Sequence, residues 1–230
     1  MALRPRVLSP SECTIDLPLI VGFTGPAKSG KDTSAKAISS IIKSLCNVNI
    51  TMLSFASPIR EIGKLFGYTE EQMSNQELKE TYLDNYITNV TPRKFMQLVG
   101  TDMFRNCLDK NIWVRLLESK IVEKIYPGQV EYLNNGSRWK PNKIYFITDV
   151  RFPNEAEAIK KHNGIVIRVN REQGISSAKD AWRKHESEIV MDEITPDYVW
   201  NNDSKSALGW CSKSLELFDG IMMEKNITLV

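Results

Sequence analysis

The stretch "LPLIVGFTGPAKSGKDTSAK", residues 17–36, decides the fold, because it joins a short apolar run to a glycine-containing turn and then to a helical pattern. The apolar run at 17–25 is typical of a strand that is buried on both faces of a sheet. Gly25, Gly30 and Lys31 follow the spacing G-x-x-x-x-G-K, which between a strand and a helix indicates a phosphate-binding loop. The stretch therefore predicts an α/β fold that binds a polyphosphate.

The two glycines let the backbone curl so that successive N–H groups point toward a phosphate, and the start of a helix adds its own N–H groups and dipole. Lys31 is predicted to bridge the outer phosphates, which makes it a catalytic residue. The alternative is a glycine-containing turn with a surface lysine. The predicted ligands of the donor nucleotide in this loop are Gly25, Lys28, Ser29, Gly30, Lys31, Asp32 and Thr33.

Asp32 stands where a hydroxyl residue usually follows the lysine, and Thr33 comes one step late. A carboxylate beside a polyphosphate is repelled unless a cation lies between them. We therefore predict that Asp32 binds Mg²⁺ or one of its waters and that Thr33 bonds an inner phosphate. The alternative is that Asp32 only caps the helix.

Composition narrows the class of protein. The chain has 230 residues, 42% hydrophobic, with a net charge of +2, which favours a domain with a proper core and argues against a general nucleic-acid binder. The four cysteines show no metal-ligand spacing, and no apolar run reaches the roughly 18–20 residues of a membrane span. We predict a cytoplasmic protein with no nucleic acid and no membrane as partner. The oligomeric state stays open, with a homodimer as the favoured alternative.

Strand patterns alternate with helical patterns, which predicts a central parallel sheet of about five strands flanked by helices. Ser57 is the expected cap of the first helix after the second strand, with Pro58 at its first position. The predicted strands are 17–25, 49–56, 143–151, 164–171 and 196–203, and the predicted helices include 57–67, 91–126 with a break near Asp109, 154–163 and 206–218. We expect a flexible tail at 1–16 and one domain at 17–230, with a mostly helical acceptor-binding region at 57–142 and a short lid at 172–190.

The segment "DVRFPNE" follows the third strand pattern. Side chains two apart on a strand share a face, so Asp149 and Arg151 leave the carboxyl end of the strand together, where open α/β sheets bind ligands. We predict that Asp149 orders Mg²⁺ or its waters and that Arg151 offsets charge on the transferring phosphoryl group, both as catalytic residues. Glu155 orients Arg151 or contacts a substrate sugar. The alternative is a structural ion pair before a helix that starts at Pro153.

Two pairs of residues in the helical region are four apart and are expected to share helical faces: Arg93 with Gln97, and Arg105 with Asp109. An arginine can grip a phosphate, an amide can read a base edge, and an aspartate can fix the arginine or contact a deoxyribose. Without further context such pairs are more often solvated surface bridges. Arg60 is either a phosphate ligand or a surface charge.

The loop "GKDT" (30–33) resembles the GKGT variant of the nucleoside monophosphate kinases, and its aspartate form is similar to that of the bacteriophage deoxynucleoside monophosphate kinases. Animal phosphomevalonate kinases share "SGKD" as distant relatives. Further stretches that resemble the phage family are "SFASPIRE" (54–61), "TPRKFMQLVGTDMFRN" (91–106), "ITDVRFPNEAEAI" (147–159), "HESE" (185–188) and "NND" (201–203).

The resemblance implies a P-loop NTPase fold with a helical acceptor-binding insertion, and transfer of a phosphoryl group from ATP to a deoxynucleoside monophosphate with Mg²⁺. It implies small nucleotide substrates as partners and, if the source is viral, the host cytoplasm as location. It favours Arg105, also catalytic, and Asp109 as site residues and makes Arg93 and Gln97 candidates; Arg171, which ends the fourth strand pattern, is a candidate to stack on the donor adenine. The rival hypotheses are a kinase of another small phosphorylated acceptor, such as phosphomevalonate, and a nucleotide-binding ATPase module.

Overall fold

The computed structural model describes residues 14–15, 18–46, 48–75, 77–82, 89–121, 138–139, 143–171 and 190–229. The chain divides into two compact units. The sheet unit comprises Met1–Met52 and Val122–Val230, and the helical unit comprises Leu53–Ile121. The predicted lid at 172–190, apart from residue 190, and most of 122–142 lie outside the described residues.

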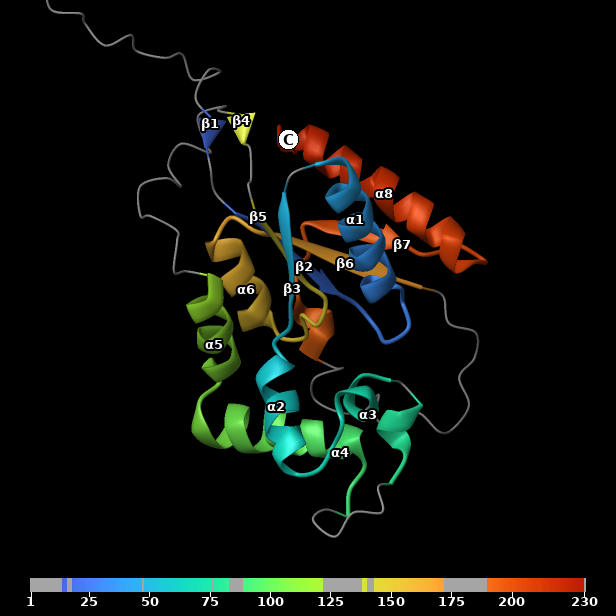
Figure 1. Ribbon diagram of the computed structural model, residues 1–230. Helices are drawn as coiled ribbons and strands as arrows, with labels where there is room; N and C mark the ends of the chain where they lie inside the picture. Colours follow the sequence, from blue (N-terminus) through green and yellow to red (C-terminus); the bar gives the residue numbers. More distant parts are fainter. Residues whose placement is uncertain are drawn as a thin grey trace, which may run out of the picture. The chain divides into compact units, whose positions relative to one another are not determined.

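A five-stranded sheet with the order β3-β5-β2-β6-β7 forms the centre of the sheet unit (Figure 1). The pairings of β5 with β2, β2 with β6, and β6 with β7 are parallel. The strands are β2 (Leu19–Thr24), β3 (Asn49–Leu53), β5 (Lys143–Ile147), β6 (Ile165–Asn170) and β7 (Tyr198–Asn201). The predicted α/β fold with a parallel sheet of five strands is confirmed.

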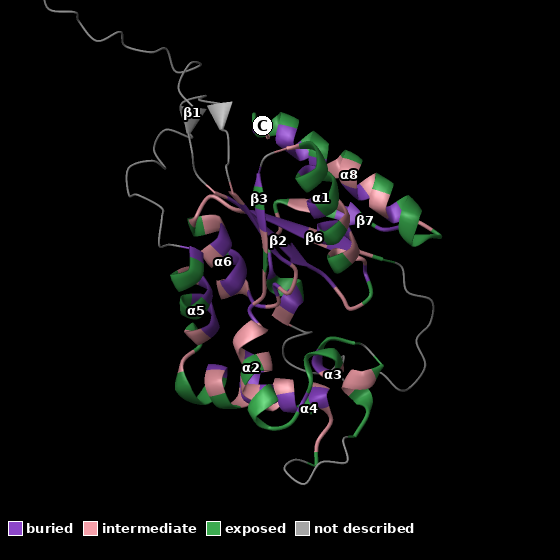
Figure 2. Ribbon diagram, in the orientation of Figure 1, coloured by how far each residue is buried: buried purple, intermediate pink, exposed green. Residues whose placement is uncertain are grey.

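β2 lies at the middle of this sheet, and all six of its residues are buried (Figure 2). Its apolar run fits this place because strands inside a parallel sheet are covered on both faces. The register pairs Val21 with Phe146 of β5 on one side and with Ile165 of β6 on the other. The carboxyl ends of β2 and β5 are therefore neighbours, and the backbone N–H of Val150 donates to the carbonyl of Phe23 at 3.2 Å.

Helices cover both faces of the sheet (Figure 1). α1 (Lys31–Leu45) and α8 (Ala207–Glu224) pack against each other on one face. α6 (Pro153–Lys161) packs on the other face, against β2 and β6. A methyl group at Gly22 would lie 2.5 Å from the Ile159 side chain of α6, so a glycine in β2 allows this helix to come close to the sheet.

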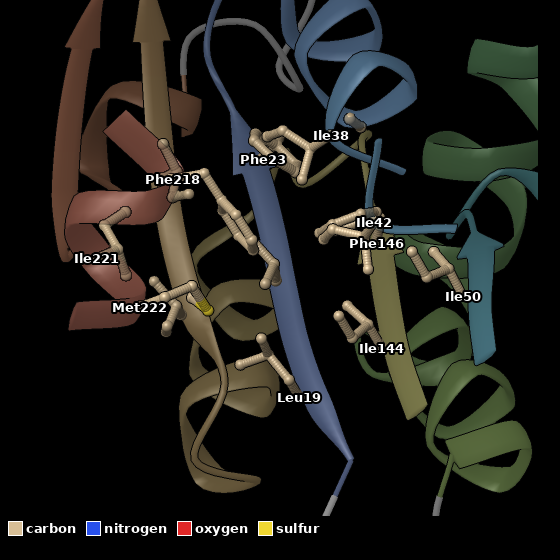
Figure 3. Close-up of a cluster of buried hydrophobic side chains, with 14 of the residues drawn as sticks. Leu19, Phe23, Ile38, Ile42, Ile50, Ile144, Phe146, Phe218, Ile221 and Met222 are labelled. Atoms are coloured by element: carbon tan, nitrogen blue, oxygen red, sulfur yellow. The ribbon is translucent and has the colours of Figure 1, made fainter. Parts of the chain in front are cut away.

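The main core lies between the sheet and the α1–α8 pair (Figure 3). The ring of Phe146 packs edge-on against Phe23 and against Phe218, with 5.9 Å between centroids in both pairs. Ile221 and Met222 extend this core, which explains why α8 continues to Glu224 and does not end at 218 as predicted.

The helical unit contains α2 (Ser57–Leu65), α3 (Glu70–Ser74), the 3₁₀ turn η2 (Leu78–Glu80), α4 (Pro92–Gln97), the π-helix η3 (Leu98–Leu108) and α5 (Ile112–Ile121). The predicted break near Asp109 is confirmed, because Asp109 is the extended residue that ends η3. The prediction that Ser57 caps α2 is wrong: Ser57 lies inside the helix, and the hydroxyl of Ser54 accepts from the N–H of Ala56 at 3.2 Å. Among the described residues, no helix is long and apolar enough to cross a membrane.

Two short strands precede β2 and β5 along the chain. β1 (Thr14–Ile15) pairs in parallel with β4 (Arg138–Trp139). Thr14 and Ile15 belong to the segment that we expected to be a flexible tail. They form a strand because the neighbouring strands that follow, β2 and β5, bring the two preceding segments together.

We predict that Phe146→Ala lowers the free energy of unfolding by about 3–5 kcal/mol, because the lost ring leaves a cavity in a packed core. Urea denaturation followed by circular dichroism measures this change. Val199→Ala on β7 is the control, since Val199 is 53% exposed and its truncation should change stability by less than about 0.5 kcal/mol. Equal losses in the two variants would contradict the assignment of the core.

Candidate active site

The phosphate loop connects the carboxyl end of β2 with the start of α1. Gly25, Lys28 and Gly30 all have positive φ, at 125°, 62° and 109°, so the backbone curls tightly. A methyl group at Gly25 would lie 2.2 Å from the carbonyl oxygen of Val169. Glycine is therefore required at position 25 both by its φ and by the close approach of β6.

Lys31 lies over the loop to which it belongs. Its ammonium donates to the carbonyl oxygens of Gly25 at 2.7 Å and Pro26 at 2.6 Å. The positive charge is thus held at the curl of the backbone, where the predicted phosphates would bind. An ammonium has three donors and binds carbonyl and phosphate oxygens alike.

Two hydroxyl groups are fully buried at the loop, those of Thr24 at the end of β2 and Ser29 within the turn. Neither hydroxyl oxygen has a hydrogen-bond partner among the described residues. Buried unsatisfied polar groups are rare and concentrate at functional positions. Together with the curled backbone and the ammonium of Lys31, they fit a site for an oxygen-rich anion.

Asp32 is tied to the neighbouring strand end. Its carboxylate accepts a hydrogen bond of 2.8 Å from the hydroxyl of Thr148, the residue that follows β5 and precedes Asp149. The alternative that Asp32 caps α1 is wrong, since the cap position is Gly30 and no side chain caps it. The structure thus brings the segments of both predicted magnesium ligands, Asp32 and Asp149, to one edge of the sheet.

Thr148 is a residue that the sequence analysis missed. Its signal was its place at a strand end directly before Asp149, but its partner lies 116 residues away in sequence. Among the described residues, no group of three or more His, Cys, Asp or Glu could hold a metal ion.

Glu155 fixes the backbone of the predicted catalytic segment. Its carboxylate is only 2% exposed and accepts from the N–H groups of Arg151 at 2.8 Å and Phe152 at 3.2 Å, just before α6. It therefore orients Arg151 through the main chain. This burial disfavours the other predicted role of Glu155, contact with a substrate sugar.

Two arginines of the helical unit are held by carboxylates. Arg60 lies 3.0 Å from the carboxylate of Glu70 and donates to the hydroxyl of Ser54 at 2.9 Å. Arg93 pairs with Glu80. Arg93 lies four residues before Gln97 on α4, so the predicted common helical face is present.

The expectation that Arg105 and Asp109 share a helical face is wrong. η3 is a π-helix, in which the N–H of Asp109 bonds to the carbonyl of Phe104, five residues earlier. Asp109 leaves the helix in an extended conformation, and its carboxylate binds Arg115 at 2.6 Å. Arg105 is buried and donates to the carbonyl of Lys110 at 3.0 Å.

Of the remaining predicted ligands, Lys28 is exposed in the loop, and Thr33 lies in the first turn of α1. Arg171 follows β6 directly and is exposed. Sequence reasoning also missed Trp210 and the role of Asn202, whose side chains donate to main-chain carbonyls of the loop. These two side chains are considered separately below because of what they do to the loop.

The parallel sheet, the strand–loop–helix unit and the lysine over the curl define an α/β fold of the P-loop NTPase class. Comparison with known sequences shows the family within this fold class to which the chain belongs. The model of the deoxynucleotide monophosphate kinase family matches residues 66–208. The chain belongs to the deoxynucleotide monophosphate kinase family.

Two relatives come from viruses. The chain is 33% identical to a protein of Acanthamoeba polyphaga mimivirus described as "Putative deoxynucleotide monophosphate kinase", with 76% of this chain and 83% of the relative covered. It is 27% identical to the deoxynucleoside-5'-monophosphate kinase of Escherichia phage T5, with 63% and 73% covered. Among solved structures, the APS kinase of Mycobacterium tuberculosis is similar at 10% identity and a TM-score of 0.38, covering 89% of this chain and 99% of that one.

We predict that Glu155→Ala destabilises the protein by about 2–3 kcal/mol, because it leaves two N–H groups before α6 without their charged acceptor. Glu155→Gln, which keeps an acceptor oxygen, should cost less. Glu157→Ala is the matched control, since Glu157 lies exposed on the same helix. Urea denaturation of the three variants measures their free energies of unfolding and so tests this order of stability losses. Equal stability of Glu155→Ala and Glu157→Ala would refute the structural role of Glu155.

Proposed function

We propose that the protein transfers the γ-phosphoryl group of ATP to a deoxynucleoside monophosphate, giving ADP and the deoxynucleoside diphosphate. The observation that carries the proposal is the curled loop at the end of β2 with the ammonium of Lys31 over it. Because the chain belongs to the deoxynucleotide monophosphate kinase family, we infer that the anion bound by this loop is the phosphate chain of a nucleotide. The proposal therefore makes small nucleotides the binding partners of the protein.

The loop holds the phosphates of ATP in this proposal. Its main-chain N–H groups bind the outer phosphate oxygens, Thr33 bonds an inner phosphate, and Lys31 exchanges its carbonyl partners for phosphate oxygens. Bound Mg²⁺ supplies charge neutralisation and a fixed geometry for the outer phosphates. Asp32 and Asp149 are the residues that would hold the ion or its waters, and Thr148 keeps the carboxylate of Asp32 in place.

The reaction requires no protein nucleophile. A phosphate oxygen of the acceptor forms the new bond to the γ-phosphorus while the bond from that phosphorus to the β–γ bridging oxygen breaks. The attacking oxygen is already ionised near neutral pH, so positioning and charge stabilisation carry the catalysis. Arg151, whose backbone Glu155 fixes, offsets charge on the transferring group. Arg105 is the second arginine in this role; it is buried and bonds to the carbonyl of Lys110, so it must exchange that partner to reach the phosphoryl group.

The helical unit supplies the acceptor ligands in this proposal. Arg60 and Arg93 bind the acceptor phosphate after exchanging the carboxylates that now hold them. Such partly exposed ion pairs contribute only about 0–1 kcal/mol to stability, so exchanging one for a phosphate costs little free energy. Gln97 reads a base edge, and Asp109, which pairs with Arg115 and not with Arg105, contacts the deoxyribose. Arg171 stacks on the donor adenine.

The rival hypotheses are disfavoured by the family assignment. A phosphomevalonate-type kinase would keep the loop but use a different acceptor, and an ATPase module would release phosphate to water. The homodimer, the lack of a nucleic-acid partner and the host cytoplasm as location stay predictions; the viral relatives support the last of these.

We predict that ADP release depends on at least one deoxynucleoside monophosphate in a panel of dAMP, dCMP, dGMP and dTMP. Ribonucleotides, phosphomevalonate and no acceptor complete the panel. ADP formation with ATP alone at the full rate would support an ATPase module, and turnover with phosphomevalonate alone would support the other rival.

We expect Lys31→Ala and Arg151→Ala to lower kcat about 100-fold or more, because each removes a positive charge from the transition state. Lys36→Ala is the control, since Lys36 lies exposed on the same helix as Lys31. The variants should keep the circular dichroism spectrum of the parent protein. Undiminished turnover in Arg151→Ala would remove that residue from the catalytic set.

We expect Thr148→Val to raise the Mg²⁺ concentration for half-maximal activity roughly fivefold, because Asp32 loses the hydrogen bond that orients it. Thr148→Ser restores the hydroxyl and should restore the parent dependence. Magnesium titrations at saturating nucleotide measure the effect. Identical titration curves for Thr148→Val and the parent would show that Thr148 has no part in metal binding.

A further inference from the structure

Asn202 and Trp210, which lie after β6 in the sequence, donate hydrogen bonds to main-chain carbonyls of the phosphate loop. The amide Nδ2 of Asn202 donates to the carbonyl oxygen of Ser29 at 2.8 Å. The indole Nε1 of Trp210 donates to the carbonyl oxygen of Gly30 at 3.2 Å. The pairs are 173 and 180 residues apart in sequence, so only the fold brings them together.

These bonds determine where the next two N–H groups point. A peptide group is planar and trans, so its carbonyl and its N–H point in opposite directions. When Asn202 holds the carbonyl of Ser29, the N–H of Gly30 is directed away from Asn202. When Trp210 holds the carbonyl of Gly30, the N–H of Lys31 is fixed in the same way. Both N–H groups belong to the curl that binds phosphate in the proposed function.

The loop needs such support. Lys28 and Gly30 both have positive φ, and glycine has more backbone freedom to lose than any other residue. A rotated peptide plane would turn an N–H donor away from the phosphates and present a carbonyl oxygen to them. The carbonyl of Gly30 is further held by the backbone N–H of Ser34 at 2.9 Å and its hydroxyl at 3.1 Å.

The two donors approach the loop closely. A methyl group at Gly30 would lie 2.5 Å from Nε1 of Trp210 and 2.8 Å from Nδ2 of Asn202. Glycine at position 30 is thus required by its positive φ and also by the room that these two side chains take. The second glycine of the motif is therefore what lets both donors reach the loop.

Asn202 and its surroundings are themselves rigidly held. Asn202 is 5% exposed, and its backbone N–H donates to the carbonyl of Asn170 at the end of β6. The next residue, Asp203, accepts from Lys213 of α8 at 2.7 Å, and this hydrogen bond is the main reason that the pKa of Asp203 is lowered. Asp203 therefore stays ionised at neutral pH and bonds to the helix, although such an exposed ion pair contributes little to stability.

Trp210 is placed by the start of α8. It is 2% exposed and belongs to the main core. The helix is capped by Ser206, whose hydroxyl accepts from the N–H of Gly209 at 3.1 Å. Donors that are fixed before the ligand arrives need no reorganisation when it binds, which is the condition for electrostatic preorganisation.

We propose that Asn202 and Trp210 are positioning residues that aim the N–H groups of Gly30 and Lys31 at the phosphates of the donor nucleotide. This inference rests on the proposed function, because it assumes that the loop binds a nucleotide. It adds a role for the segment after β7 and for α8: Asn202 and Trp210 complete the phosphate site by holding its backbone.

Trp210→Phe is the central test, because it removes one N–H and keeps the aromatic ring. Trp200→Phe is the matched control: Trp200 is equally buried, on β7, and packs on Phe23 with 6.0 Å between ring centroids. We expect Trp210→Phe to raise the Kd for ADP roughly fivefold, because it removes the indole donor to the carbonyl of Gly30 and leaves only the two donors of Ser34 to hold that peptide group. Isothermal titration calorimetry measures Kd directly, with no need for turnover.

Asn202→Asp is the second variant, since a carboxylate cannot donate to the carbonyl of Ser29. We expect its Kd for ADP to rise at least as much, and the KM for the acceptor to stay within about twofold of the parent in both variants. The backbone amide resonances of Gly30 and Lys31 in ¹⁵N–¹H spectra supply a readout that stability alone does not change. Their shift on addition of ADP should shrink in Trp210→Phe and stay unchanged in Trp200→Phe.

The outcomes separate the two proposals. Absence of ADP binding to the parent protein would overturn the proposed function itself. If the parent binds ADP, an unchanged Kd and unchanged amide shifts in Trp210→Phe would overturn the positioning role. An equal loss of affinity in Trp200→Phe would also overturn it, because the effect would then come from general packing.

Discussion

The structure depends on one tight junction, where the buried central strand β2 turns into the loop before α1. Gly25 passes so close to β6 that a methyl group would lie 2.2 Å from the carbonyl of Val169. A side chain at position 25 would therefore push the loop off β6, and glycine keeps the loop against the buried sheet. A backbone that is anchored in this way can keep several N–H groups turned toward an anion, although unliganded polar groups in such an arrangement are costly.

Charged groups in both units are held by neutral or oppositely charged partners. Lys31 rests on two carbonyls, Asp32 on the hydroxyl of Thr148, and the arginines of the helical unit on glutamates. The two arginine–glutamate pairs are partly exposed, and pairs of this kind contribute little to stability. The buried carboxylate of Glu155 is different, because it binds main-chain N–H groups and is a permanent part of the fold.

The C-terminal elements contribute to the site as well as to the core. α8 packs on α1 and carries Trp210 to the carbonyl of Gly30, while the segment after β7 carries Asn202 to Ser29. The segment after the last strand and the last helix thus bond to two carbonyls of a loop near the start of the chain. A P-loop consists of short-range sequence, but in this protein its geometry is completed by contacts across the whole sheet unit.

The sequence by itself determined the strand–loop–helix unit, the parallel sheet and the break at Asp109, because these depend on local periodicity and on backbone preferences of glycine and proline. It misassigned the cap of α2, because the helix begins one residue earlier than the Ser-Pro pattern suggests and Ala56 is its cap residue. It also misassigned the face of Arg105 and Asp109, since a switch from four-residue to five-residue helical bonding has no clear local pattern. The partners of Asp32, Ser29 and Gly30 were decided only by the tertiary structure. They lie 116 to 180 residues away, and the order of strands in the sheet, which no local pattern specifies, sets which chain ends meet.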